Sequence, residues 1–156
     1  NADPLNMEDD TWAAVYSFEQ FLWQPEGAPT RGVGVFFSAG VSDGNPNPIK
    51  SSYSLGLVGK GVVPNRPHDN FGIGWARTVL SDDFLRELRA LPLNLGLDYE
   101  DVVELYYNVS ITPWLSVSPS LQIVSPALNK TFDPTSQAFK DLDTTYIAGV
   151  RVGIRC

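Results

Sequence analysis

Residues 102–123 decide the fold, and they read VVELYYNVSITPWLSVSPSLQI. On either side of the Thr112-Pro113-Trp114 turn, apolar and polar residues alternate with a period of two, which is typical of β-strands and not of helices. One face of the predicted hairpin is therefore apolar. The other face carries Glu104, Tyr106, Asn108, Ser110, Ser116, Ser118, Ser120 and Gln122.

The same period recurs along most of the chain, in blocks separated by clusters of Gly, Pro, Asn and Asp. In the third block Lys60 lies on the face opposite the large apolar residues, and in the last block Arg151 and Arg155 do so. We expect seven antiparallel strands, over Trp12–Trp23, Val33–Val41, Tyr53–Val63, Phe71–Val79, Val102–Ile111, Leu115–Ile123 and Tyr146–Ile154.

The first predicted strand does not keep a single register. Phe18 and Leu22 share one face, whereas Phe21 and Trp23 take the other, so large apolar residues occur on both faces. A β-bulge places one extra residue in a strand, so that residues after the bulge change face and the apolar residues return to one side. We therefore predict a β-bulge near residues 19–20.

One segment has a helical period. Ser81–Leu91 carries apolar residues at helical spacing after two acids, Asp82 and Asp83, in the first turn. Ser81 stands at the position of an N-cap, where a hydroxyl accepts a hydrogen bond from a free backbone N–H. We predict a short helix in the connection between the fourth and fifth strands.

The predicted connections alternate in length. Residues 24–32, 64–70 and 112–114 form short connections, and residues 42–52, 80–101 and 125–144 form long ones. In a transmembrane β-barrel, short turns face the periplasm and long loops face the outside of the cell. The alternation favours such a meander.

Large aromatic residues lie near the ends of the predicted strands. Membrane barrels carry girdles of aromatic rings at both interfaces, and a buried core does not require this distribution. A plainer interpretation is that aromatic residues are common in strands generally. The candidate interface residues are Trp23, Phe71 and Trp114 at the short-turn ends, and Trp12, Tyr53 and Tyr146 at the long-loop ends.

Composition excludes several classes of function. Eleven Lys and Arg against 18 Asp and Glu leave a net charge of -7, which disfavours a nucleic-acid binder. With His68 as the single histidine, no catalytic triad or histidine-rich metal site is expected. The acidic runs at residues 8–10, 82–83 and 100–101 are expected to be solvated acids, or divalent-ion bridges to lipopolysaccharide, rather than catalytic pairs. We expect no catalytic residues, no metal and no cofactor.

Three segments resemble the C-terminal part of the carbohydrate-selective porins of the OprB family: Gly32–Pro48, Arg66–Trp75 and Glu104–Gln122. The last, with its tyrosine pair, Thr-Pro-Trp turn and Ser-rich second strand, is the most specific. The resemblance implies an all-β, antiparallel up-and-down transmembrane β-barrel in the bacterial outer membrane. Residues 1–156 would form a single partial porin domain, about seven strands of a barrel that needs about 16 to 18 to leave an aqueous channel.

The resemblance also implies partners. Small sugars would pass by passive diffusion, without any reaction, and outer-membrane lipid and lipopolysaccharide would surround the barrel. A homo-oligomer is left open by the residues. Members of the family typically end in an aromatic residue, whereas this chain ends in Cys156. We therefore expect a truncated or mistranslated end rather than the family's authentic C-terminus.

A sugar channel needs a wet wall of hydrogen-bonding groups, with some aromatic faces for pyranose rings. Side chains of both charge signs suit neutral polyhydroxylated solutes better than a one-sign ring suited to anions. We therefore predict that the pore is lined by Lys60, Glu104, Tyr106, Asn108, Ser110, Ser118, Gln122, Arg151 and Arg155.

Two alternatives follow from the same pattern. A soluble antiparallel β-sandwich or small barrel that binds a carbohydrate or protein ligand would bury the apolar face against a second layer. A glycoside hydrolase would need two carboxylates about 5 to 9.5 Å apart across a cleft.

Overall fold

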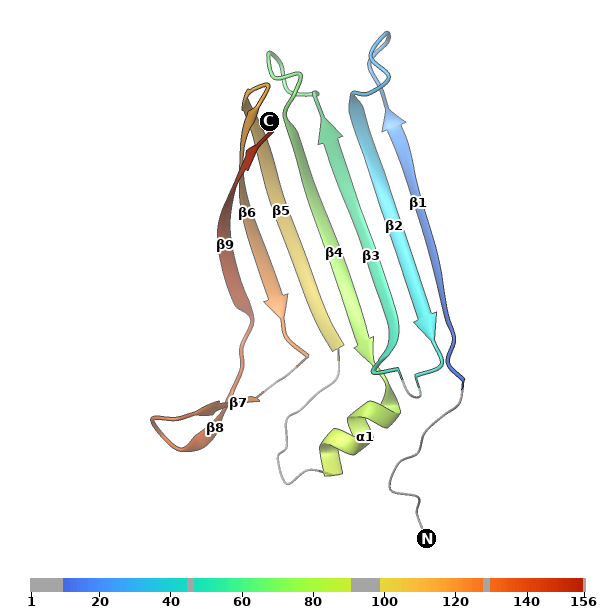
Figure 1. The fold of residues 1–156 in the computed structure, drawn as a ribbon, viewed down its shortest axis with the longest axis vertical. Helices are drawn as coiled ribbons and strands as arrows, with labels where there is room; N and C mark the ends of the chain where they lie inside the picture. Colours follow the sequence, from blue (N-terminus) through green and yellow to red (C-terminus); the bar gives the residue numbers. More distant parts are fainter. Residues whose placement is uncertain (1–9, 45–46, 91–98, 128–129, 156) are drawn as a thin grey trace.

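The computed structural model describes residues 10–44, 47–90, 99–127 and 130–155. Seven strands form one antiparallel sheet in the order β1-β2-β3-β4-β5-β6-β9, which confirms the predicted all-β meander (Figure 1). Each strand in this order pairs antiparallel with its neighbour. The strands are β1 (Ala13–Trp23), β2 (Gly32–Ser42), β3 (Ile49–Lys60), β4 (Asn70–Leu80), β5 (Tyr99–Thr112), β6 (Leu115–Ser125) and β9 (Thr145–Ile154).

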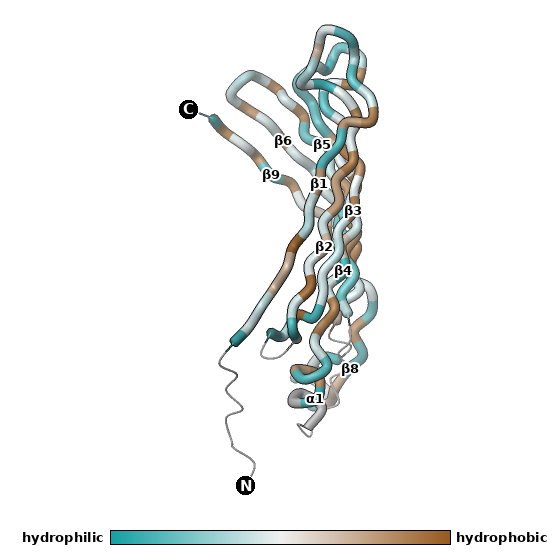
Figure 2. Tube along the Cα trace, turned by 90° about the vertical axis from the view of Figure 1, so that its right-hand side faces the viewer, coloured by the Kyte–Doolittle hydropathy of each residue, from teal (hydrophilic) through white to brown (hydrophobic). Residues whose placement is uncertain are grey.

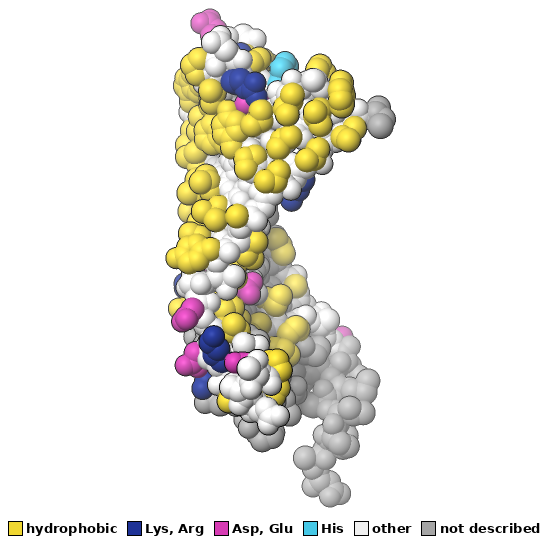
Figure 3. Space-filling view, turned by 90° about the vertical axis from the view of Figure 1, so that its left-hand side faces the viewer, with side chains coloured by type: hydrophobic (Ala, Val, Ile, Leu, Met, Phe, Trp, Pro, Cys, Tyr) yellow, Lys and Arg dark blue, Asp and Glu magenta, His cyan; other side chains and the backbone are white. Residues whose placement is uncertain are grey.

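The sheet is curved and open. Its two edges, β1 and β9, both bend to the same side, which leaves one concave and one convex face (Figure 2). Hydrophobic side chains follow the convex side, and the opposite side is hollowed (Figure 3). The short connections lie at one end of the strands, and the long connections with the helix lie at the other (Figure 1).

Strand register assigns each side chain to a face. Directly paired residues point to the same side of a sheet, and successive residues alternate. Phe37 of β2 pairs with Leu55 of β3, and Ile73 of β4 pairs with Leu105 of β5, so these apolar residues share the convex face. No second sheet covers this face in the described residues: Leu55 is 51% exposed and Val150 is 72% exposed. The β-sandwich alternative, which buries the apolar face, does not fit this arrangement.

The predicted bulge of the first strand was placed too early in the sequence. Pairing between β1 and β2 is regular up to Phe21, which faces Gly34, and shifts before Trp23, which faces Val33. Leu22 is the additional residue. Trp23 therefore returns to the convex face, on the same side as Phe18, and the alternation fails only at the end of the strand.

The third strand also differs from its predicted limits. It spans Ile49–Lys60 and not residues 53–63. Gly61 has a positive φ of 61°, a conformation that favours glycine and ends the strand. Its N–H donates to the Asp69 carbonyl at 2.8 Å, which closes the turn toward β4.

The predicted helix is present as α1 (Asp82–Ala90). Ser81 Oγ accepts a hydrogen bond from the Phe84 N–H at 3.2 Å, as predicted for an N-cap. Lys50 Nζ lies 2.7 Å from Asp82 Oδ2, which ties the helix start to β3. Leu91, the predicted last residue, lies outside the described residues. In the described parts of the chain, no helix is long and apolar enough to cross a membrane.

A second, two-stranded sheet lies in the connection between β6 and β9, and it was not predicted. It consists of β7 (Lys130–Asp133) and β8 (Ala138–Asp141). The rings of Phe132 and Phe139 contact each other edge to face, with centroids 5.8 Å apart. Four-residue strands contain too few alternations for a sequence period to reveal them.

At the short-turn end, Asp69 joins the β3–β4 turn to β5. The residue is only 3% exposed. Arg66 Nε donates to Oδ2 of this carboxylate at 2.7 Å, the Tyr107 hydroxyl donates to Oδ2 at 2.9 Å, and the Ser110 N–H donates to Oδ1 at 2.9 Å. Charge-assisted hydrogen bonds of this kind are stronger than neutral ones, so the turn is held firmly against its neighbouring strand.

Replacing Asp69 with Asn should lower the free energy of unfolding by about 2 kcal/mol, because a buried carboxylate loses its charge-assisted hydrogen bonds. Denaturant unfolding at pH 7, followed by tryptophan fluorescence, measures the change. Glu26→Gln, which alters an exposed acid of the β1–β2 turn, is the matched control. Equal unfolding midpoints for the two variants would contradict the role assigned to Asp69.

The effect of Asp69 should also depend on pH. Burial raises the pKa of this carboxyl, but hydrogen bonds from Arg66, Ser110 and Tyr107 outweigh burial and hold the pKa below its ordinary value. Because the pKa is lower in the folded state, the stabilisation by the Asp69 carboxylate is complete above the ordinary carboxyl pKa, which is about 4. It is lost as the pH falls through the pKa of the folded state. The stability difference between the wild type and Asp69→Asn should shrink over that interval.

Candidate functional site

The concave face carries a rung of polar side chains that crosses five strands near the short-turn end. Lys60 pairs with Asn70, and Asn70 pairs with Asn108. The Ser118 hydroxyl donates to Asn108 Oδ1 at 2.7 Å, and Ser118 pairs with Arg151. Residues from β3 to β9 thus form a continuous polar row, with a cation at each end.

All the residues predicted to line a pore that lie within the strands share this concave face. Glu104 pairs with Gln122 in the middle of the β5–β6 hairpin, and Ser110 pairs with Ser116 toward its turn. Tyr106 lies between these pairs, opposite Ser120. The structure therefore brings together side chains that are up to 95 positions apart in sequence, from Lys60 to Arg155.

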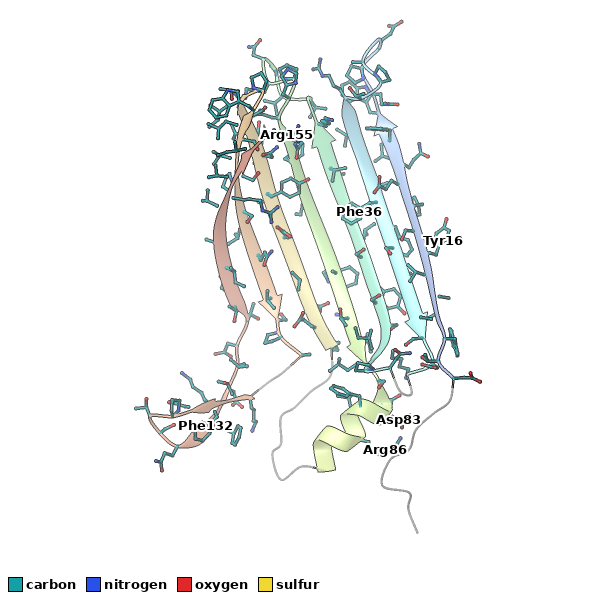
Figure 4. All side chains as sticks on the ribbon, in the orientation of Figure 1. Tyr16, Phe36, Asp83, Arg86, Phe132 and Arg155 are labelled. Atoms are coloured by element: carbon teal, nitrogen blue, oxygen red, sulfur yellow. The ribbon has the colours of Figure 1, made fainter. Side chains whose placement is uncertain are left out.

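Arg155 follows β9 directly and lies at the short-turn end (Figure 4). Its N–H donates to the Trp114 carbonyl at 2.9 Å. Together with Lys60 and the exposed His68, Arg155 lines a recess of about 440 Å³ whose other walls include Asn108. This recess is the most basic part of the described concave face.

Charges of opposite sign are separated along the strands. Lys60 and Arg151 belong to the rung near the short turns, whereas Glu104 lies in the row that passes through Gly74 and Gly56. Gly56 and Lys60 are four residues apart in β3, which corresponds to roughly 13 Å. The sequence predicted side chains of both charges on this face. In the fold, the basic ones lie near the short turns and the acidic Glu104 lies farther toward the long loops.

Further residues on this face were not singled out from the sequence. Phe36 pairs with Gly56 and Glu19 pairs with Phe36, so both lie on the concave face. Phe36 is labelled in Figure 4. The alternation of residues 33–41, which groups Phe36 with Gly34 and Gly40, contains enough information to find Phe36. Glu19 was not assigned to a face from the sequence, because the bulge was predicted at residues 19–20.

Aromatic residues lie along the convex face, several of them near its two ends. Trp23, Phe71, Tyr53 and Tyr146 lie on this face by register. Trp114 occupies the β5–β6 turn, and Trp12 directly precedes β1. The register adds three residues that the sequence did not single out as interface residues, namely Tyr99, Tyr107 and Trp75, and Trp75 lies in the middle of β4.

Phe71 and Tyr107 form an aromatic pair at the short-turn end. Their rings are stacked, with centroids 6.3 Å apart and planes inclined by 3°. The Phe71 ring also covers Gly59, where an added Cβ would lie 2.5 Å from Cζ of the ring. Glycine at position 59 of β3 therefore leaves the space that the Phe71 ring occupies.

One ion pair lies on the convex face near the long-loop end. Arg77 Nε lies 2.8 Å from Asp101 Oδ1, and Arg77 NH2 lies 2.6 Å from Oδ2. Trp75 Nε1 donates to Asp101 Oδ1 at 3.1 Å, and the guanidinium lies 4.2 Å from the centre of the Tyr99 ring. Charged groups on an otherwise apolar face are thus neutralised by each other and covered by aromatic rings.

Three of the four acids in the runs at residues 82–83 and 100–101 form ion pairs within the chain. Asp82 pairs with Lys50, Asp83 with Arg86 and Asp101 with Arg77. Glu8 and Asp9 lie outside the described residues. No group of three or more His, Cys, Asp or Glu side chains that could hold a metal ion occurs in the described ranges.

Comparisons with known proteins agree with the sequence resemblance. The model of the family described as "Carbohydrate-selective porin, OprB family" matches residues 1–155. The chain is 28% identical over 146 residues to Porin B of Pseudomonas aeruginosa, covering 86% of the chain and 30% of Porin B. It is 30% identical over 86 residues to Porin AaxA of Chlamydia pneumoniae, covering 54% of the chain and 18% of that protein.

A solved structure shares the fold. The high-pH structure of Pseudomonas putida OprB superimposes with a TM-score of 0.71 at 25% sequence identity, covering 90% of this chain and 34% of that one. The chain therefore spans about a third or less of the length of these porins.

Removing one member of the Arg77–Asp101 ion pair should lower the free energy of unfolding more than removing both members. Arg77→Leu leaves the Asp101 carboxylate on an apolar face, at an expected cost of about 1 to 2 kcal/mol for a partly exposed pair. The double variant Arg77→Leu/Asp101→Leu should recover most of this loss. Denaturant unfolding in detergent micelles measures both, with Lys50→Leu at the exposed Lys50–Asp82 pair as the control that changes little. A double variant less stable than the single one would contradict this account.

Proposed function

Because the chain belongs to the OprB family of carbohydrate-selective porins, we propose that its seven strands form one sector of the wall of an outer-membrane channel that passes carbohydrates by passive diffusion. The division between the two faces of the sheet carries this proposal. The concave face is polar across β3 to β9, and the convex face is apolar and exposed, as lipid contact requires.

The polar rung is proposed to form part of the wet lining. A diffusing sugar needs hydrogen-bond partners that replace its water without holding it long. Amides and hydroxyls at Asn70, Asn108 and Ser118 suit this role because they both donate and accept. Lys60 and Arg151 at the ends of the rung, and Glu104 farther along the strands, give charges of both signs, which suits neutral polyhydroxylated solutes.

The aromatic residues of the convex face are proposed to lie at the two membrane interfaces. Amphipathic rings favour the boundary between headgroups and hydrocarbon. Trp23, Phe71 and Trp114 would mark the periplasmic side, and Trp12, Tyr53 and Tyr146 the outer side. The long-loop end, with its acids and the Arg77–Asp101 pair, would then contact lipopolysaccharide.

The proposal predicts sugar flux. The protein that carries this chain, reconstituted into lipid vesicles, should let D-glucose equilibrate rapidly while retaining a large dextran, because a water-filled channel discriminates by size. Osmotic swelling of the vesicles measures the rate, and protein-free vesicles are the control. Vesicles that contain folded protein and still exclude glucose would refute the proposed function.

The assignment of faces predicts opposite labelling of neighbouring residues in β6. In a Cys156→Ser background, Ser118→Cys should react with a charged, membrane-impermeant thiol reagent in lipid vesicles, because its side chain would face water. Val117→Cys, the adjacent residue on the convex face, should not react. Mass spectrometry of the labelled protein measures both, and equal labelling would contradict the assignment.

A further inference from the structure

The middle of the concave face is built differently from the polar rung. Among the aromatic residues of the seven strands, Phe21, Phe36 and Tyr106 face this side. They lie in two adjacent rows, since Phe21 and Tyr106 belong to the row through Gly34 and Gly72, and Phe36 belongs to the next row. Aromatic rings thus interrupt an otherwise polar wall.

Two of these rings extend over glycines of the neighbouring strands. A Cβ at Gly56 would collide with the Phe36 ring, and a Cβ at Gly74 would lie 3.3 Å from Phe36 Cζ. A Cβ at Gly72 would lie 2.6 Å from Tyr106 Cε1. The ring atoms therefore occupy the space that a side chain would fill on the neighbouring strand, and each ring is only partly exposed. The exposed part of each ring faces the concave side of the sheet.

A recess of about 290 Å³ lies beside Phe36. Its walls include Phe21 and Phe36, with Gly34 and Val58 beneath and the exposed Glu19 at its side. Small-ligand sites are lined by aromatic and apolar groups with a few placed polar groups, and their volumes begin near 300 Å³. The recess therefore has the size and chemistry for one small ring rather than an oligomer.

We propose that this Phe21–Phe36 recess is a stacking subsite for a single pyranose ring, with the Glu19 carboxylate as acceptor for its hydroxyl groups. The electron-rich face of an aromatic ring attracts the partly positive C–H groups that line a pyranose face. Tyr106, with Glu104 beside it in the row of Phe36, offers a second face farther across the wall. This inference rests on the proposed function, because the recess must open into the lumen.

Current block by D-glucose tests the subsite, since the ring hydroxyls at C2, C3 and C4 of this sugar are equatorial and both ring faces carry C–H groups. The protein that carries this chain is inserted into planar lipid bilayers, and the glucose concentration that halves the ionic current is measured. Phe36→Leu should raise this concentration about three- to tenfold, the range expected for loss of one aromatic contact. Phe36→Tyr should keep it near the wild-type value.

The chain offers a matched control in the next residue. Phe37→Leu makes the same change on the convex face and should leave the block by glucose unchanged. If Phe36→Leu does not insert, Glu19→Gln supplies an independent test and should raise the half-blocking concentration about two- to threefold. Sorbitol, an acyclic polyol of similar size, should block more weakly than glucose in the wild type.

The outcomes separate this inference from the proposed function. Equal half-blocking concentrations in the wild type, Phe36→Leu and Glu19→Gln would overturn the subsite. A wild-type channel that passes glucose in the vesicle assay but shows no block by glucose would overturn the subsite and leave the proposed function intact. Exclusion of glucose from vesicles would overturn both.

Discussion

Inter-strand hydrogen bonding in one continuous register, from β1 to β9, is the constraint on which the rest of the structure depends. Side chains alternate between faces with a period of two, so a slip of one residue would move every side chain of a strand to the opposite face. The register irregularities lie near strand ends, at residues 21–23, 49–51 and 110–112. The middle of the sheet keeps its division into a polar concave face and an apolar convex face.

Glycine and aromatic residues shape the wall together. An aromatic ring can extend over the next strand only where that strand has no side chain, and this pairing of ring and glycine occurs on both faces. Phe36 lies over Gly56 and Tyr106 over Gly72 on the concave side, and Phe71 lies over Gly59 on the convex side. Glycine usually weakens a strand, but the covering ring protects the exposed backbone and restores the lost packing. At these glycines the sheet carries no side chain of its own, and the aromatic ring of a neighbouring strand covers the backbone instead.

The two ends of the sheet are secured by different means. At the short-turn end, the buried Asp69 binds three donors, two of them from β5. At the long-loop end, Ser81 caps α1 and its N–H donates to the Pro48 carbonyl, which links the helix to the preceding long connection. Within the described ranges no second layer of structure covers the sheet, so polar contacts to neighbouring strands, rather than a buried core, fix its connections.

Local alternation determined a large part of this protein. Residues 102–123 predict the hairpin and the face of each side chain in it, because the period of two is a property of the chain itself. The resemblance to a porin family rests on local motifs, such as the tyrosine pair and the Thr-Pro-Trp turn. The Ser81 cap and helix are local in the same sense. The position of the bulge at Leu22 was not predictable, because residues 16–23 contain large apolar side chains on both faces and only pairing with β2 decides between them.

Contacts between strands were decided by the tertiary structure alone. The sequence around Asp69 indicates only that the residue lies in a turn. Its role in anchoring the turn was not predictable, because its partners Tyr107 and Ser110 are about 40 positions away. The Arg77–Asp101 pair and the Phe21–Phe36 recess likewise depend on which residues the register brings side by side. Sequence alternation assigns a residue to a face, but its neighbours on that face are set by hydrogen bonding between strands, and no local pattern encodes that pairing.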